Sequence, residues 1–498
     1  MFFCQTGLRA KCEISDITDM SPTKPPLTPG QLAAMSAGGR RLVLAVVAHY
    51  EARLSAMEVR MAELEAQLAA ATKTPQNSSL PPSTQHPHAK PAAPKPQSKK
   101  KQGGQPGHPR HERPLIPAEQ CQNVVTCRPE TFRRCETPLT GSDPEPLRHQ
   151  VWEILEIKPL VTEYQRHRLK CPRCCETTCG HLPAGVPHSQ AGPHLVALVA
   201  LLMGCFRQSK RRVALFLNIV LNQPCSPGGV VKLQNQATAA LTPAYDELVR
   251  QLPAEAVLAL DESPTKQGDK KARLWAAIAT NFTVFTLRTT RAATVVKELL
   301  TEAFRGVVNC DRAKMYWQVG RLQWCWAHLK RDFLALIDHP DRQVKRLGHD
   351  LMRQTKLLFR QWSRCRDGTI SRAEMLGLMA PIRHEVEGLL LRGMFSGNPR
   401  LTGMCRELCT HREWLWTFLE VDGVQPTNNA AERALRPAVI WRKLSFGTQS
   451  ATGSLFVGTI LTVIETCRQQ SRNPFAYLTA AIQAHFAGQR HPSLLPGA

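Results

Sequence analysis

Residues 256–263 read Ala-Val-Leu-Ala-Leu-Asp-Glu-Ser, and this stretch decides the fold. The apolar residues at 256–260 have the length and composition of a buried strand, which we expect to end at the carboxylate of Asp261. Fifty positions later, the short apolar run at 306–310 ends in the same way at Asp311. Two acids delivered by two strand ends indicate a site in which carboxylates act together.

The segment between these two strands predicts how they are arranged. Two β-rich runs at 273–280 and 282–288 are followed by a helix-like segment at 292–304. Three strands in meander order, then a helix and a strand, are expected of an RNase H-like α/β core, in which the first and fourth strands are neighbours. Their acids would share metal. Mg²⁺ (or Mn²⁺) prefers oxygen ligands, and two such ions can assist phosphoryl displacement, so we expect two.

A third carboxylate would complete this site, and Glu432 in Asn-Asn-Ala-Ala-Glu-Arg (428–433) is the best candidate. Asn428 follows Pro-Thr and is a plausible N-cap, which would place Glu432 on the first turns of a helix. The alternative is an ordinary surface acid paired with Arg433 or Arg436.

Charge and hydropathy restrict the environment and the partners of the chain. The formal net charge is +24 and the pI about 9.7, which suits a polyanion, with nucleic acid as the leading candidate over a protein that is merely basic. The longest apolar run, 195–206, is too short for a membrane span, and residues 1–3 do not begin a secretory signal. We therefore expect a cytoplasmic protein without membrane contact, with Met1 or Met20 as its first residue.

The N-terminal part predicts a helix and a linker. Apolar residues recur at spacings of four and three, as in a heptad seam, so the helix at 40–73 could pair with a copy of itself or pack on its own domain. The seam consists of Val43, Val47, Tyr50, Leu54, Met57, Met61, Leu64 and Leu68. Residues 74–116 are rich in Pro, Ser, Gln and Lys, which is typical of a linker, either a basic arm along phosphates or a solvated tether.

Cysteines at 127, 135, 171 and 174 suggest a structural zinc site around short antiparallel strands expected at 150–170. The Cys171–Cys174 knuckle is regular. The other is imperfect, because Phe132 stands where a CxxC ending at Cys135 would need cysteine. The alternative is a set of unligated cytosolic thiols; the tentative Zn²⁺ ligands are Cys127, Cys135, Cys171 and Cys174.

Three helices are expected at 195–206, 211–221 and 230–241, with a break at 224–229. The last two resemble a helix-turn-helix, and a plain helical spacer is the alternative. The candidate phosphate contacts are Arg207, Lys210, Arg211 and Arg212.

Several motifs, taken together, resemble one family. They are Asp-Glu-Ser (261–263), Arg-Leu-Trp (273–275), Cys-Trp-Ala-His-Leu-Lys-Arg-Asp-Phe (325–333), Asn428 to Arg436, Arg-Lys (442–443), Ser-Phe-Gly (445–447), the Gly-Gly-Gln-Pro-Gly-His linker (103–108) and the 171–174 knuckle. With these residues the chain resembles the insertion-sequence-66 (IS66) family of DDE transposases over roughly 40–485.

This resemblance implies catalytic acids at Asp261, Asp311 and Glu432, and an enzyme that cuts element ends and joins their 3′-OH to target DNA. It implies DNA as partner (terminal inverted repeats and target), a homo-oligomer, accessory proteins from the same element, and a bacterial nucleoid location. The long spacing between the second and third acids implies a helical insertion at about 340–420. Residues expected to contact DNA near the acids are His328, Lys330, Arg331, Arg433, Arg436, Arg442 and Lys443. For His328 the alternatives are orienting a carboxylate or a buried structural role, and for some of the cations an ordinary surface charge.

The expected organisation is a multidomain α/β chain. Its parts are 1–39 (poorly defined), 40–73 (coiled coil), 74–116 (linker), 117–190 (zinc-ribbon-like), 191–250 (helical, DNA-binding), 251–339 and 421–485 (RNase H-like core), 340–420 (helical insertion) and 486–498 (tail). The chain departs from the family pattern at Arg312-Ala313, where Gly and an aromatic are expected. A catalytically decayed, dimeric, zinc-bearing DNA-binding protein and a structure-selective nuclease are the alternative functions.

Overall fold

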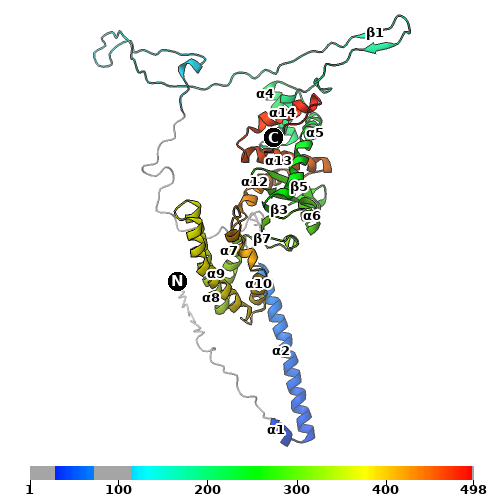
Figure 1. Cartoon of the computed structure of the whole chain (residues 1–498), viewed down its shortest axis with the longest axis vertical. Coiled ribbons are helices and arrows are strands. Elements are labelled where there is room, and N and C mark those ends of the chain that lie inside the picture. The colour runs from blue at the N-terminus through cyan, green and yellow to red at the C-terminus, as the bar shows by residue number, and fades with distance from the viewer. Residues whose placement is uncertain (1–28, 72–113, 496–498) are drawn as a thin grey trace, which may run out of the picture. The chain divides into compact units, whose positions relative to one another are not determined.

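The computed structural model describes residues 29–71 and 114–495, which belong to two separate units, 1–85 and 86–498. In the first unit a short helix, α1 (Pro29–Ala34), precedes the long helix α2 (Ala37–Ala71) (Figure 1). Six of the predicted seam residues, from Val47 to Leu64, have exposed side chains, for example Leu54 at 59% and Met61 at 60%. The remaining part of the 1–39 segment, residues 1–28, and most of the predicted linker lie outside the described residues.

Residues 114–190 of the second unit contain little regular structure. A 3₁₀ turn, η2 (Ala118–Gln120), is followed much later by a hairpin of β1 (Arg168–Lys170) and β2 (Thr177–Cys179). The antiparallel strands predicted at 150–170 are therefore wrong except for the last three residues. The apolar alternation there is real, but side chains such as Ile154 (82% exposed) find no core to pack against within the described structure.

Three helices follow, as expected. They are α3 (Pro193–Gly204), α4 (Lys210–Leu221) and α5 (Pro227–Gln251). Ser209 and Ser226 cap the second and third helices by accepting backbone N–H bonds, and Asn222 ends α4 in the left-handed conformation. The prediction for α5 ended ten residues too early, because the helix continues through Pro243 along a buried apolar face.

A five-stranded mixed sheet forms the centre of the second unit, with strand order β5-β4-β3-β6-β7. The strands are β3 (Val257–Gln267), β4 (Lys270–Ile278), β5 (Thr283–Arg288), β6 (Val307–Cys310) and β7 (Leu322–Trp324). The meander β3-β4-β5 is antiparallel, whereas β6 runs parallel to β3 and β7 parallel to β6. Helix α6 (Ala293–Leu300) connects β5 to β6, so the predicted element order and the neighbouring first and fourth strands are confirmed.

One strand boundary differs from the prediction. β3 does not end at Asp261 but continues six residues further, paired with β4 up to Gln267↔Lys270. Only the parallel pairing with β6 stops early, at Ala259↔Asn309. Gly306 makes the close approach of β6 to the start of β3 possible, since a Cβ there would collide with the carbonyl oxygens of Glu255 and Ala256.

Three helices lie at the end of the chain: α12 (Asn429–Ser445), α13 (Ala451–Gln469) and α14 (Pro474–Phe486). α12 packs on β3 and β4, α13 packs on β5, and α14 packs on α3 and α5. In Figure 1, α13 runs beside β5, and its side chains complete the open edge of that strand: the backbone N–H groups of Thr283 and Phe285 donate to the hydroxyls of Thr466 (3.1 Å) and Thr462 (2.8 Å). Two edge donors thus gain acceptors.

The β7 side carries α7 (Trp326–Ile337) and the helical segment α8 (Arg342–Arg366), α9 (Arg372–Met394), α10 (Pro399–Thr410) and α11 (Glu413–Glu420). α8 packs on α7 and α9, and α10 packs on α9. These helices occupy the predicted 340–420 insertion. The chain then returns to the sheet through α12.

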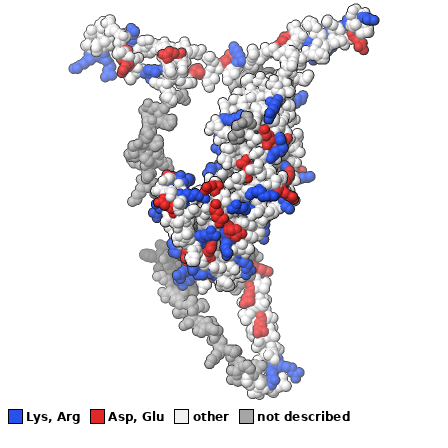
Figure 2. Space-filling model, in the orientation of Figure 1, with Lys and Arg blue, Asp and Glu red and all other residues white. Residues whose placement is uncertain are grey.

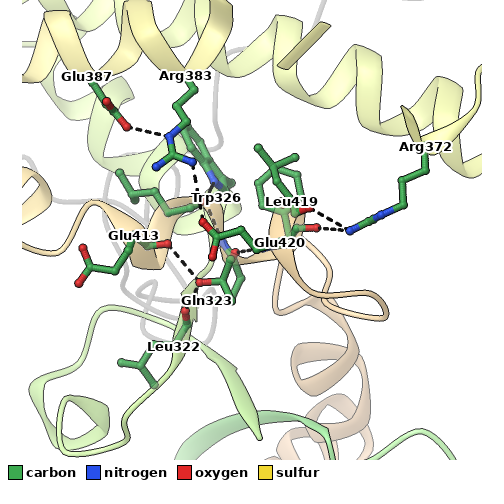
Figure 3. Close-up of polar contacts among 12 residues, drawn as sticks. Leu322, Gln323, Trp326, Arg372, Arg383, Glu387, Glu413, Leu419 and Glu420 are labelled. Carbon is green, nitrogen blue, oxygen red and sulfur yellow. Dashed lines mark hydrogen bonds and ion pairs between the residues drawn. The ribbon is translucent and has the colours of Figure 1, made fainter. Parts of the chain in front are cut away.

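A buried polar junction holds this helical segment to the sheet (Figure 3). The amide of Gln323 in β7 donates to the carbonyl of Leu415 (3.2 Å) and accepts from the N–H of Phe418 (2.8 Å). Trp326 Nε1 also donates to Leu415 O (2.8 Å), and the Thr417 hydroxyl donates to Leu322 O (2.6 Å). α11 is therefore bound to the sheet edge by side chains that are themselves buried.

No helix within 29–71 or 114–495 is long and apolar enough to span a membrane.

Candidate active site

Two of the predicted acids lie at equivalent positions of neighbouring strands. The last paired residues of β3 and β6 are Ala259 and Asn309, and Asp261 and Asp311 each lie two residues beyond that pair. Parallel neighbours are about 4.8 Å apart, and residues two positions apart share a face, so the two carboxylates leave the same face side by side. Asp311 directly follows β6, as predicted.

Two asparagines fix the start of the helix that carries the third acid. Asn309 of β6 donates to the carbonyls of Gln425 (2.7 Å) and Thr427 (3.1 Å), and Asn428 donates to Leu260 O in β3 (2.8 Å). Asn428 does occupy the N-cap position of α12, but its side chain makes no capping bond, so the predicted role was wrong. Asn309 was not among the predicted site residues, although an amide within an apolar strand is a usable signal.

The first turn of α12 consequently places Glu432 near the two aspartates. Its side chain is 33% exposed, and its ion-pair partner in the described structure is His328 of α7, with Nε2 3.7 Å from Glu432 Oε1, rather than Arg433 or Arg436. That separation is too long for a hydrogen bond. Glu432 Oε1 and His328 Nδ1 are both buried atoms without a hydrogen-bond partner in this part of the chain.

The acids influence one another electrostatically. Desolvation raises the pKa of Asp261 well above its ordinary value, and the negative charges of Asp311 and then Glu432 raise it further, against a lowering hydrogen bond from the Glu262 backbone. Glu262 differs: it forms ion pairs with Arg273 (3.2 Å) and Arg291 (2.5 Å). Arg273 and Arg291 therefore form ion pairs with Glu262, which is not one of the three predicted acids.

A divalent cation fits this chemistry in part. Repulsion among the carboxylates raises the pKa of Asp261, and a bound cation would reduce this repulsion. A cation would also give the unpartnered oxygen of Glu432 a partner. The three carboxylates do not, however, form a complete metal-binding group. Among the described residues, no three or more His, Cys, Asp or Glu side chains lie close enough together to hold a metal ion.

The same finding applies to the predicted zinc ligands. Cys171 and Cys174 lie in a tight turn closed by Cys171 N–Glu176 O (2.8 Å), and hydrogen bonds from the backbone of Cys174 and Arg173 lower the pKa of Cys171. A hydrogen bond to Thr137 lowers the pKa of Cys135. Cys127 and Cys135 are exposed on a different segment, so the structure presents one half of the predicted site.

Predicted DNA contacts separate into two groups. The first group consists of exposed cations on the helices that carry Glu432 and His328: Arg433, Arg436 and Lys443 on α12, and Lys330 on α7 with the less exposed Arg331 beside it. Arg442 instead points inward, donating to the Ser263 hydroxyl (3.2 Å) and to Pro264 O in β3. Burial and the charge of Arg273 lower its pKa. It braces β3 rather than facing solvent.

The second group lies away from the acids along the chain. Arg207 occupies the connection between α3 and α4, and Lys210, Arg211 and Arg212 form the exposed first turn of α4. These helices pack with each other and with α5. On the face shown in Figure 2, Lys and Arg side chains are interspersed with Asp and Glu over the second unit. This face therefore carries no continuous basic surface.

Fold and site together define a mixed α/β protein with clustered carboxylates on one face of its sheet. A family model described as "Transposase IS66 family" matches residues 188–454, which is more than half of the chain and includes all three acids. The chain therefore belongs to the IS66 transposase family. A second model, "Family of unknown function (DUF6444)", matches residues 25–114.

Two curated relatives are similar over part of their length. "Uncharacterized protein y4qI" of Sinorhizobium fredii is 27% identical over 201 residues, which cover 36% of this chain and 36% of the relative. "Uncharacterized protein y4jO" of the same organism is 26% identical over 172 residues, 34% of this chain and 51% of the relative. The chain thus spans about a third to a half of the relatives it matches.

Proposed function

We propose that this transposase cuts the ends of an insertion sequence and joins the exposed 3′-OH groups to target DNA, with Asp261, Asp311 and Glu432 as its catalytic acids. The observation that carries the proposal is the equivalent placement of the two aspartates beyond the β3–β6 pairing, with the first turn of α12 alongside. We further propose that the mixed sheet is an RNase H-like core, since its meander, crossover helix and parallel fourth strand have that order.

In the reaction, water attacks a phosphorus atom at the element end and the departing oxygen becomes a 3′-OH. That hydroxyl then attacks a phosphorus of target DNA, forming one phosphodiester and releasing one 3′-OH. Mg²⁺ or Mn²⁺, as two ions held by the three acids, would supply the Lewis acid for both steps. The chain's own contribution is position: Asn309 and Asn428 fix α12 to both strands. Arg433, Arg436 and Lys443 would bind phosphates beside the acids.

A structural Zn²⁺ on Cys171 and Cys174, completed by Cys127 and Cys135, belongs to the same proposal but takes no part in the reaction. The support is the turn geometry of the knuckle and the lowered pKa of Cys171, which favours the thiolate that zinc binds. Accessory proteins of the element and a place in the bacterial nucleoid are further parts of the proposal.

The function is tested with DNA carrying the sequences that flank the coding region on both sides. We expect wild-type protein with Mg²⁺ to nick these ends and join them to a target, and Glu432→Gln to lower the rate at least about a hundredfold. Glu413→Gln, an exposed acid on α11, is the matched control and should act as wild type.

Other results would select other functions. Specific end binding without any Mg²⁺-dependent nicking would indicate the decayed DNA-binding protein, and cleavage without joining would indicate the nuclease. Unchanged activity of Glu432→Gln would show that the third acid is assigned wrongly.

We also propose that α2 pairs with α2 of a second copy, parallel and in register. With Leu54 and Met61 on the seam, Arg53 lies at a position that faces Glu58 of the next heptad in a parallel partner, giving two opposite-charge pairs per dimer. In an antiparallel pair, equivalent heptad positions of the two helices face each other. Arg53 would then lie opposite a position that also carries a basic residue. The charge pattern therefore favours the parallel arrangement.

Charge reversal tests this orientation. Arg53→Glu alone and Glu58→Arg alone should each weaken self-association of the full chain about tenfold, because attraction becomes repulsion in two exposed pairs. The double variant should restore it. Sedimentation equilibrium measures the association, and a double variant no tighter than the single ones would contradict parallel pairing.

A further inference from the structure

Arg312, the residue after the second acid, binds two carboxylates from different helices. Its Nη2 lies 2.8 Å from Asp332 Oδ2 on α7, and its Nη1 lies 3.2 Å from Glu407 Oε1 on α10. All three side chains are only 21–29% exposed. One planar guanidinium thus joins β6, α7 and α10, which are separated along the chain by α8 and α9.

This ion-pair group is one of the attachments of the helical segment 342–420. Two others are the packing of α8 on α7 and the buried junction of α11 with β7 through Gln323 (Figure 3). The Arg312 attachment lies just beyond the carboxyl end of the β6–β7 pair, two residues after Cys310↔Trp324. It is the attachment that lies next to Asp311.

Arg312 is linked directly to the acid cluster, because it is the next residue in the chain after Asp311. Asp311 precedes Arg312, and its Oδ1 accepts from the backbone N–H of Ala313 (2.9 Å), so the acid and the arginine share one short turn. Asp332 lies one helical turn after His328, whose Nε2 faces Glu432. α7 therefore touches the arginine beside the second acid with one side chain and the third acid with another.

We propose that Arg312 is a positioning residue, which fastens α10 to α7 and to the strand end of Asp311 and so makes the helical segment part of the acid site. This inference rests on the proposed function for its effect on catalysis, but its structural consequence is independent of that function. In the described structure both terminal nitrogens of Arg312 are used by Asp332 and Glu407. Its role is to hold the turn that carries Asp311.

Glu407→Gln is the sharpest variant, because it removes only the charge of the α10 carboxylate that faces Arg312 and leaves the Arg312–Asp332 ion pair intact. We expect hydrogen–deuterium exchange in peptides covering 311–316 and 399–410 to rise at least about fivefold, with little change at β4 and α13. Arg312→Lys should behave similarly, since one ammonium cannot span both carboxylates. Arg392→Gln, which breaks the exposed Arg392–Glu385 pair (3.2 Å) in α9, is the control and should leave these peptides unchanged.

Cleavage of element ends is the second readout. Glu407→Gln should cleave about tenfold more slowly and need several times more Mg²⁺ for half-maximal rate, while binding ends in EDTA as wild type. Unchanged exchange at 311–316 in Glu407→Gln and Arg312→Lys would overturn the proposal. Absence of cleavage in wild type would instead overturn the proposed function, and exchange would still decide the role of Arg312.

Discussion

Asp261→Asn should abolish strand transfer and at the same time make the protein harder to unfold. The activity should fall at least about 10³-fold, roughly 4 kcal/mol of lost transition-state stabilisation, because a neutral amide replaces one of the three proposed catalytic acids. The gain in stability follows from the raised pKa of Asp261: in the folded protein its carboxylate is desolvated and repelled by Asp311 and Glu432.

The pH dependence follows with a definite sign. A raised folded-state pKa means that the folded protein holds this proton over a range where the unfolded chain, with its pKa of about 4, has lost it. Wild-type stability therefore falls as pH rises through that range. The advantage of Asp261→Asn should be present at neutral pH and absent below about pH 4, as measured by thermal unfolding at a series of pH values without divalent ions.

Asp269→Asn provides the matched control, since it removes the same charge from the exposed β3–β4 turn. It should change neither the rate nor the unfolding temperature. A less stable Asp261→Asn, or one that transfers strands at the wild-type rate, would contradict the acid cluster.

Gln323→Leu should destabilise the second unit by about 3 kcal/mol. The side chain is fully buried, and leucine would leave the N–H of Phe418 and the carbonyl of Trp324 without their amide partner, at a cost of about 1–3 kcal/mol for each buried group. The Leu415 carbonyl keeps its bond from Trp326. Denaturant unfolding followed by tryptophan fluorescence measures the change.

Gln483→Leu makes the same substitution on an exposed position of α14 and should stay within about 0.5 kcal/mol of wild type. If Gln323→Leu were equally harmless, α11 would be held by apolar packing alone rather than by the Gln323 amide.

The sequence predicted best what is decided locally. The apolar runs around 257–260 and 307–310 become β3 and β6, and the helices expected at 211–221 and 230–241 are α4 and the first part of α5, because these signals lie within a few residues. The extension of β3 to Gln267 was missed, since Ser263 and its successors are polar and become a strand only by pairing with β4.

Long-range contacts explain the other differences. Asn428 looks like a local cap, but it reaches Leu260, 168 residues earlier in the chain. Arg442 looks like a surface cation, but it is used against β3. The 151–167 segment shows the reverse case: a local strand pattern without a partner strand in the described structure remains unpaired.

The helices that cover the two edge strands affect when the sheet can fold during translation. β5 obtains hydrogen-bond acceptors from Thr462 and Thr466, and β7 is covered by α11, so both edges depend on residues made long after the strands. A nascent chain that has emerged only as far as β7 would present two bare strand edges, which are templates for pairing with other chains. Ribosome-bound intermediates and products of premature termination before α13 should therefore aggregate, and the sheet should mature only near the end of translation.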